Sequence, residues 1–245
     1  MDISNTVTGY FKTTSAEYGV SLTDEQVASF VKYYEMLVEK NKVMNLTAIT
    51  EYPDVVEKHF LDSLALAKYF DLTKDISLMD VGTGAGFPGI PLKIAFPNLK
   101  VTLSDSLNKR LNFLNEVISE LGLKDITTVH GRAEDLGRDK AYREQFDVVT
   151  SRAVANLSTL SEYCLPFAKV GGFFIPYKSG KGEEEAAAAA KAIPTLGGKI
   201  EDTKQFILKS SSEGDLERCF FFIKKEKPTP KAYPRKAGTP SKNPL

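Results

Sequence analysis

ISLMDVGTGAGFPG, residues 76–89, is the stretch of this 245-residue chain that decides its fold class. A short apolar run around Asp80 is typical of a buried parallel strand, and four glycines follow within eight residues. Pro88 suits the first turn of a helix. Glycine permits positive φ and leaves room for a ligand against the backbone, while the amides at the helix start face that ligand. The segment therefore predicts a strand, a glycine loop and a helix that bind a nucleotide-type cofactor.

The glycine spacing leaves open which cofactor binds. Counted from Gly84, the loop also matches the dinucleotide pattern G-x-G-x-x-G through Gly86 and Gly89. On its own it is compatible with NAD and with S-adenosylmethionine. A turn without any ligand is a further alternative, although a bare turn rarely needs so many glycines.

An acidic residue follows the next expected strand at the position of a ribose contact. Residues 100–104 form this strand, and Asp105 lies 21 residues beyond Gly84. A carboxylate at this distance from the glycine loop can bind the two hydroxyls of a ribose. Capping the helix expected at 107–121 is its alternative role. We favour the ribose contact because the glycine loop precedes it.

The third and fourth strands end in two further candidate segments. Residues 125–130 lead to Ala133 and Glu134, beside the adenine end of a nucleotide bound at the first strand. A helix start with acids in its first turn is the alternative there. Residues 146–150 lead to Arg152, which would face the reacting end of the ligand from across the switch point. Otherwise it is a surface arginine.

Five strands alternating with helices, followed by a strand pair, predict an α/β fold with a mostly parallel, doubly wound, seven-stranded sheet. Its ligand crevice lies at the carboxyl ends of the strands. The remaining expected elements are a helix at 157–168, a strand at 172–177, a helix at 183–192 and an antiparallel pair at 198–208 and 217–225.

Residues 1–70 are expected to form a helical extension ahead of the cofactor-binding domain, 71–226. One amphipathic helix occupies 23–41, where Thr23 and Gln26 form a capping box, and a second occupies 53–70.

The C-terminal residues 227–245 form a basic, proline-rich tail. The last 22 residues hold seven basic residues and one acidic residue, while the whole chain is neutral. Five prolines keep the tail from becoming a regular helix or central strand. A solvated tail and a phosphate-contacting arm are the two interpretations.

The composition is that of an ordinary globular protein, with 42% hydrophobic and 26% charged residues. No apolar run is long enough to span a membrane, and the N-terminus lacks the pattern of a secretion signal. We expect a cytoplasmic protein. Cys164 and Cys219 offer no disulfide framework, and His59 and His130 have no metal-ligand spacing. We expect no metal.

The site segments occur in an order that resembles the class I S-adenosylmethionine-dependent methyltransferases, which have a Rossmann-like fold. A closer resemblance, to the GidB/RsmG family, covers nearly the whole chain. It rests on NLT at 45–47, HFLDS at 59–63, DVGTGAGFPGIPL at 80–92, DSLNKR at 105–110, GRAE at 131–134, SRA at 151–153, Tyr177-Lys178 and YPRKAGTPSKNPL at 233–245. Ser179 departs from the pattern, because members often have glycine after the lysine.

The resemblance implies S-adenosylmethionine as cofactor. Its contacts would be Gly82, Gly84, Phe87, Asp105, Ser106, Leu107, Ala133, Glu134 and Arg152. The glycine loop would hold the amino-acid portion, Asp105 the ribose, and the segment at 133–134 the adenine. Arg152 would lie near the methionine carboxylate or the incoming RNA.

The resemblance also implies methylation of a guanine N7 in 16S ribosomal RNA, as naked RNA or within the 30S subunit or its precursor. N7 carries a lone pair, so we expect no residue that acts as an acid or base and a positioning role for Arg152. Hypothetical RNA contacts are His59, Lys93, Arg110, Lys178 and, in the tail, Arg235 and Lys236. We expect a monomer. The competing interpretations are a small-molecule methyltransferase, an NAD-dependent oxidoreductase and a noncatalytic RNA-binding module.

Overall fold

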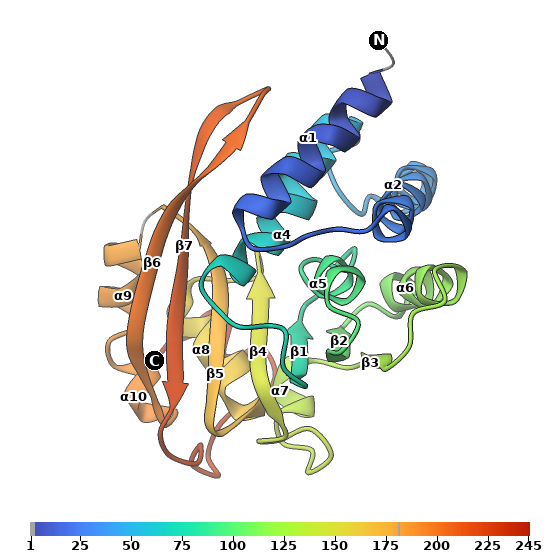
Figure 1. Cartoon of the computed structure of the whole chain (residues 1–245). Helices are drawn as coiled ribbons and strands as arrows, with labels where there is room; N and C mark the ends of the chain where they lie inside the picture. The colour runs from blue at the N-terminus through green and yellow to red at the C-terminus, as the bar shows by residue number, and fades with distance from the viewer. Residues whose placement is uncertain (1–2, 181) are drawn as a thin grey trace.

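The computed structural model describes residues 3–180 and 182–245 and shows an α/β fold built on one seven-stranded sheet (Figure 1). The strand order is β3-β2-β1-β4-β5-β7-β6; β1 to β5 are parallel, and β7 runs antiparallel to both neighbours. The strands are β1 Ser77–Val81, β2 Lys100–Asp105, β3 Ile126–His130, β4 Phe146–Arg152, β5 Ala168–Ser179, β6 Gly198–Ser210 and β7 Gly214–Lys225. The predicted mostly parallel, doubly wound sheet is confirmed.

The order of the strands reverses next to β1. The chain adds β2 and β3 on one side of β1 and then crosses to add β4 and β5 on the other. The carboxyl ends of β1 and β4 lie side by side, with Asp80 paired to Thr150. Ligand crevices of doubly wound sheets form at such a switch point.

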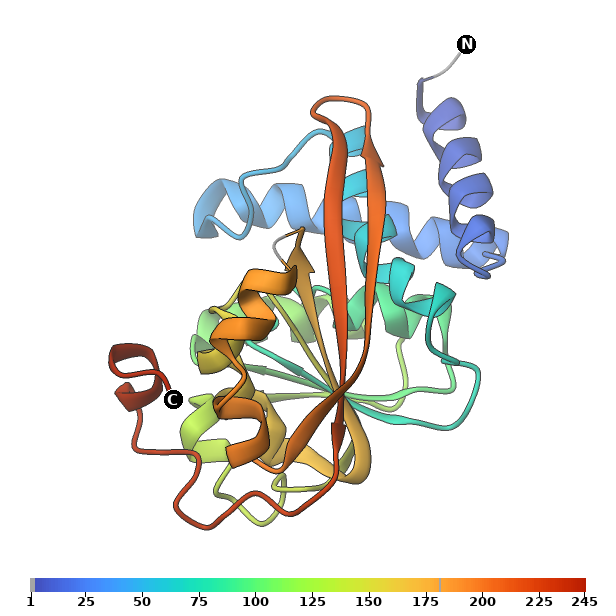
Figure 2. The ribbon, with the colours of Figure 1, turned by 90° about the vertical axis from the view of Figure 1, so that its left-hand side faces the viewer.

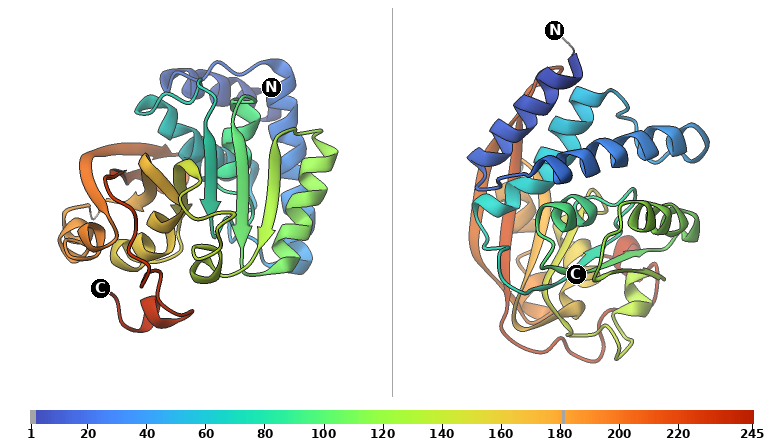
Figure 3. Two further views of the ribbon diagram at one scale, coloured as in Figure 1. Left: turned by 90° about the horizontal axis from the view of Figure 1, so that it is seen from below. Right: turned by 45° about the vertical axis from the view of Figure 1, so that its right-hand side comes forward.

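Helices cover both faces of the sheet (Figure 3). On one face, α5 Gly89–Ala95 and α6 Asn108–Glu120 bury residues such as Leu92 and Leu114 in one apolar cluster. On the other, Leu157 and Leu160 of α8 belong to a second cluster. The helices of this second face are α7 Ala133–Leu136, α8 Leu157–Cys164, α9 Gly182–Ala188 and α10 Ala192–Thr195.

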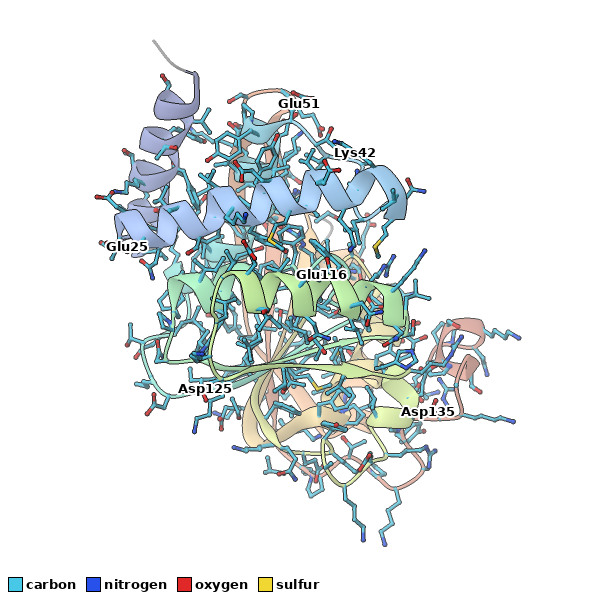
Figure 4. The ribbon with its side chains drawn as sticks, turned by 90° about the vertical axis from the view of Figure 1, so that its right-hand side faces the viewer. Glu25, Lys42, Glu51, Glu116, Asp125 and Asp135 are labelled. Atoms are coloured by element: carbon cyan, nitrogen blue, oxygen red, sulfur yellow. The ribbon has the colours of Figure 1, made fainter. Side chains whose placement is uncertain are left out.

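The N-terminal region begins with two helices, α1 Ile3–Glu17 and α2 Asp24–Met44. The capping box of α2 is present, because Thr23 accepts from the Gln26 amide and the Gln26 side chain accepts from the Thr23 amide. Figure 4 shows α2 alongside α6. The helix α1 was not predicted.

Aromatic side chains join the N-terminal helices to the glycine loop. Phe60 lies within 4.9 Å of Phe30 and 5.7 Å of Tyr33, measured between ring centroids. Tyr33 lies 5.5 Å from Phe87 and donates a hydrogen bond to the carbonyl of Ala85. The N-terminal helices therefore share one core with the cofactor loop.

The single helix predicted at 53–70 is a succession of short turns. It comprises α3 Tyr52–Val55, a π-helix Val56–Leu61, α4 Asp62–Leu64 and a 3₁₀ turn Ala65–Lys68. Wider π turns often occur at functional sites. Here the π-helix carries His59, and Asp62 follows it directly.

Two predicted helices are shorter than expected. The helix at 157–168 ends at Cys164 because Pro166 enters a 3₁₀ turn, and β5 begins at Ala168. The helix at 183–192 is divided into α9 and α10.

The β6–β7 hairpin and the C-terminal tail both reach across the molecule (Figure 2). The hairpin extends beyond the ends of the other strands. At its turn, Ser211 donates to Glu57, and Lys58 donates to Glu213. The tail folds back beside α8 and contains a single helical turn, α11 Thr239–Lys242, but no regular helix or strand, as its prolines predict. Within residues 3–180 and 182–245, no helix is long and apolar enough to cross a membrane.

Candidate functional site

The glycine loop after β1 has the conformation expected from its sequence. Gly82, Gly84 and Gly86 have φ values of 69°, 61° and 106°. A Cβ on Gly84 would have no heavy atom within 4 Å, so the loop borders open space there. A Cβ on Gly86 would lie 2.7 Å from the Tyr33 hydroxyl. One glycine thus leaves room for a ligand, and the other for the packing of α2.

Asp80 braces this loop from beneath. Its Oδ2 accepts from the Thr83 hydroxyl at 2.7 Å and the Gly89 amide at 3.0 Å. Burial raises the pKa of Asp80 to about 6, although these two hydrogen bonds lower it. Asp80 therefore acts on the ligand site through the shape of the loop.

Two adjoining pockets form a cofactor cleft along the carboxyl ends of β1, β2 and β3. The first, about 460 Å³, is lined by Gly82, Gly84, Phe87, Asp105, Ser106, Arg110, Arg152 and neighbouring residues. The second, about 160 Å³, is lined by Gly82, Asp105, Ser106, Ala133, Glu134, Tyr163 and neighbouring residues. Of the predicted cofactor residues, Leu107 alone lines neither pocket among the described residues.

Asp105 lies at the junction of these pockets. Its Oδ2 accepts from the Gly84 amide at 3.0 Å and from Arg110 at 3.3 Å, and its Oδ1 accepts from the Leu107 amide at 2.8 Å. A carboxylate has about four acceptor positions, so capacity for a ligand hydroxyl remains. The Leu107 amide thus positions the carboxylate, but Leu107 is the N-cap of α6 and that helix has no side-chain cap, so the capping interpretation of Asp105 was wrong.

Glu134 lines the smaller pocket and has a second contact that was not expected. Its buried carboxylate accepts a hydrogen bond from the Gly238 amide at 2.8 Å. The side chain that lines the cleft is therefore also held by the C-terminal tail. The sequence contained no spacing signal for this contact, because the two residues lie 104 positions apart.

A further pocket of about 530 Å³, called the acceptor pocket here, adjoins the cofactor cleft. Its lining includes Lys58, His59, Asp62, Arg152, Tyr177, Lys178, Glu213 and Arg218. His59, Arg152 and Ala153 line both this pocket and the cofactor cleft. Arg152 consequently stands at the boundary between the two.

Arg152 is held by several contacts at this boundary. It donates to Asp62 at 2.7 Å and to the Lys58 carbonyl at 3.2 Å, and its guanidinium lies 4.9 Å from the centre of the Phe87 ring. Asp62 also accepts from Arg218 at 2.9 Å. The HFLDS motif contained a signal for Asp62, whereas Arg218 was missed because only the fold brings β7 to this place.

His59 packs flat against Phe87, with ring centroids 4.5 Å apart. Its Nε2 lies 2.9 Å from the Thr47 hydroxyl, and its Nδ1 lies 3.2 Å from Arg152. Burial, followed by the positive charge of Arg152, lowers the pKa of His59 from 6.5 to about 4, against the effect of Asp62. His59 is therefore neutral at physiological pH.

This shift predicts a specific pH dependence of stability. The unfolded chain binds a proton at His59 near pH 6.5, but the folded chain does so only near pH 4. The stability is therefore complete above pH 6.5 and falls as the pH is lowered toward 4. Between pH 7 and pH 4 we expect the wild type to lose about 3 kcal/mol more unfolding free energy than His59→Gln. Urea unfolding at several pH values measures this difference. The titration of Asp80 contributes equally to both proteins and cancels in their difference. If the unfolding free energies of the two proteins changed in parallel with pH, the prediction would be contradicted.

The predicted RNA contacts are not all accessible. Lys93 is only 2% exposed and donates to the carbonyls of Pro97 and Leu99, so its prediction as an RNA contact was wrong. Arg235 is paired with the buried Glu162. The pattern of lysines and arginines could not distinguish these structural cations from free ones.

The other predicted cations lie nearer the ligand sites. Lys178 lines the acceptor pocket and pairs with Glu185, which lies outside that lining, at 2.8 Å. Arg110 lines the cofactor cleft beside Asp105, and Lys236 is exposed on the tail. In the part of the chain that the structure describes, no group of three or more His, Cys, Asp or Glu side chains could hold a metal ion.

Two solved structures have a similar fold. One is TYW2 of M. jannaschii in complex with AdoMet, with TM-score 0.53 and 16% identity, covering 73% of this chain and 79% of that one. Another is a SAM-dependent methyltransferase of Aquifex aeolicus, with TM-score 0.52 and 19% identity, covering 76% and 97%. At these identities the similarity establishes the Rossmann-like fold.

Sequence relatives are much closer. A ribosomal RNA small subunit methyltransferase G of Lachnoclostridium phytofermentans is 56% identical over 227 residues, 93% of each chain. Proteins of the same name from Exiguobacterium sibiricum and Staphylococcus aureus are 52% and 55% identical, covering 96% and 94% of this chain and 98% and 94% of theirs. The family model described as rRNA small subunit methyltransferase G matches residues 26–212. The chain therefore belongs to the GidB family of S-adenosylmethionine-dependent methyltransferases.

Proposed function

We propose that this protein transfers a methyl group from S-adenosylmethionine to N7 of a guanine in 16S ribosomal RNA of the small subunit. The relatives named above are ribosomal RNA small subunit methyltransferases. The structural observation that carries the proposal is the shared boundary at Arg152, His59 and Ala153. A methyl donor in the cofactor cleft and a base in the acceptor pocket would meet there.

The residues of the cleft fit S-adenosylmethionine. The open space beside Gly84 accommodates the methionine portion, and Asp105 has acceptor capacity for a ribose hydroxyl. Ala133 and Glu134 line the smaller pocket, which suits the adenine. Ser106 lines both parts of the cleft, and Phe87 forms its wall beside Arg152.

The chemistry requires positioning more than proton transfer. S-adenosylmethionine supplies a methyl group on a positively charged sulfur, and guanine N7 has a lone pair and no proton to lose. The chain then needs only to align the acceptor and exclude water, which can contribute several kcal/mol to lowering the barrier. The neutral His59 ring and the Arg152 guanidinium both pack against Phe87. Together they form a rigid wall that aligns the acceptor.

The acceptor pocket offers cations for RNA. Arg152, Arg218 and Lys178 line it and can donate to a phosphate or to guanine O6, while His59 borders it. Arg110 and Lys236 are accessible to phosphates outside the pocket. We propose that the protein acts as a monomer in the cytoplasm, where ribosomal subunits assemble, and without a metal.

Methyl transfer from labelled S-adenosylmethionine tests the proposal. Purified protein is incubated with labelled cofactor and either naked 16S RNA or small subunits, and acid-insoluble RNA is counted. We expect RNA labelling with at least one of these substrates, and its absence with a parallel large-subunit RNA control. Cofactor and RNA binding without any labelling would identify a noncatalytic binding module and contradict the proposal.

A further inference from the structure

The C-terminal strap, Thr229–Leu245, carries a high density of positive charge but is anchored to the protein along its length. Arg143 donates to the carbonyls of Thr229 and Tyr233 at 2.6 and 2.9 Å. Further along, the Thr159 hydroxyl donates to the Pro240 carbonyl at 3.3 Å. Figure 2 shows the strap returning from the end of β7 to the helices behind the sheet.

The strongest of these anchors is Arg235. Its amide and guanidinium donate four hydrogen bonds to the carboxylate of Glu162, at 2.6 to 3.1 Å. The Glu162 side chain is 1% exposed, and that of Arg235 is 23% exposed. Removing one partner of such a pair leaves a buried charge without compensation, so Glu162 strongly favours the attached strap.

Beyond this anchor, the strap contacts two helices that contribute to the smaller pocket in the cofactor cleft. The Gly238 amide donates to Glu134 of α7 at 2.8 Å. The strap also contacts α8, the helix that carries Tyr163, because the Thr159 hydroxyl of α8 donates to the Pro240 carbonyl. Glu134 and Tyr163 both line that pocket. The strap therefore joins α7 to α8 behind the surface where the adenine is proposed to bind.

We propose that the C-terminal strap is a positioning element for the cofactor, in which Arg235 holds the strap on Glu162 and Gly238 holds the Glu134 carboxylate at the adenine pocket. This proposal rests on the proposed use of S-adenosylmethionine. It assigns the basic tail to cofactor binding, whereas its charge alone suggested an RNA-binding arm. The match to the family model ends at residue 212, so the strap lies outside the matched residues.

Arg235 and its neighbour Lys236 provide a matched pair for the test. Arg235→Gln and Lys236→Gln remove the same charge from adjacent positions, but only Arg235 contacts Glu162, and Lys236 is exposed. For each full-length variant, the dissociation constant for S-adenosylmethionine is measured by calorimetry, and 16S RNA affinity is measured over a range of salt concentrations.

We expect Arg235→Gln to weaken cofactor binding about tenfold, as when one hydrogen bond to a charged group is lost. Lys236→Gln should bind the cofactor like the wild type. In steady-state assays, Arg235→Gln should raise KM for the cofactor and leave kcat at saturation unchanged. Arg235→Lys, which keeps one donor group, should give intermediate affinity. A purely structural defect would lower kcat as well.

Opposite results would overturn the proposal. If both glutamine variants weakened RNA binding equally, reduced its salt dependence and left cofactor affinity unchanged, the tail would be a phosphate-binding arm. Should Arg235→Gln not fold, deletion of residues 232–245 replaces it, because Glu162 then gains access to water. Unchanged cofactor affinity in that variant would also contradict the strap role. A wild type that fails to bind S-adenosylmethionine would instead refute the proposed function.

Discussion

Replacing Asp105 by alanine is expected to raise the dissociation constant for S-adenosylmethionine about 100-fold, equivalent to about 2.7 kcal/mol. The carboxylate lies at the junction of the two parts of the cleft, where it holds the Gly84 and Leu107 amides and can accept from a ribose hydroxyl. The alanine variant loses the ligand contact and leaves two amides without their partner. Isothermal titration calorimetry measures the change.

Two further variants separate these contributions. Asp105→Asn keeps an acceptor oxygen of similar shape, so its loss of affinity should be smaller than that of the alanine variant. Asp75→Ala removes an exposed carboxylate just before β1 and should leave binding unchanged. Equal affinities of Asp105→Ala and the wild type would exclude Asp105 from the cofactor site.

Replacing Arg152 by glutamine is expected to lower kcat/KM for methyl transfer about 1000-fold, or about 4 kcal/mol. This side chain separates the cofactor cleft from the acceptor pocket and contacts both Asp62 and the Phe87 ring. Glutamine cannot reproduce its charge or its planar fork of donors, and Asp62 would keep Arg218 as its partner. Single-turnover transfer to small-subunit RNA is the appropriate measurement.

The control for Arg152 is a cation near the amino ends of the strands, whereas Arg152 lies at the carboxyl end of β4. Lys140 is exposed in the segment that precedes β4, near the amino ends of the strands. Lys140→Gln should retain wild-type kcat/KM. Arg152→Lys should remain strongly impaired, because an ammonium cannot stack on Phe87 and bind Asp62 with the same geometry. Wild-type activity of Arg152→Lys would show that charge alone suffices.

Most of the fold was predictable because its signals are local. Apolar runs marked the strands, and glycine or capping residues marked their boundaries. In a parallel sheet these strands end at one edge, so Asp105, Glu134 and Arg152 were expected to converge although they lie far apart in the chain. The structure brings all three to the cofactor cleft.

The remaining features depend on contacts between distant segments. The pairing of Asp62 with Arg218 spans 156 positions, and the contact of Gly238 with Glu134 spans 104. Nothing in the spacing of these residues reveals such contacts. Lys93 is a different case, because its partners Pro97 and Leu99 are near in the chain, but only the fold buries its side chain. The distribution of charge along the sequence identified the basic tail. It could not distinguish a tail that is anchored to the protein from a free arm.

The atom that receives the methyl group can be identified directly. Small-subunit RNA labelled by the purified protein with methyl-labelled S-adenosylmethionine can be digested to nucleosides and separated by chromatography with mass detection. We expect the label to co-migrate with N7-methylguanosine and to map to one guanine of 16S RNA. Label on another base, on a ribose hydroxyl or only on a small molecule would contradict it.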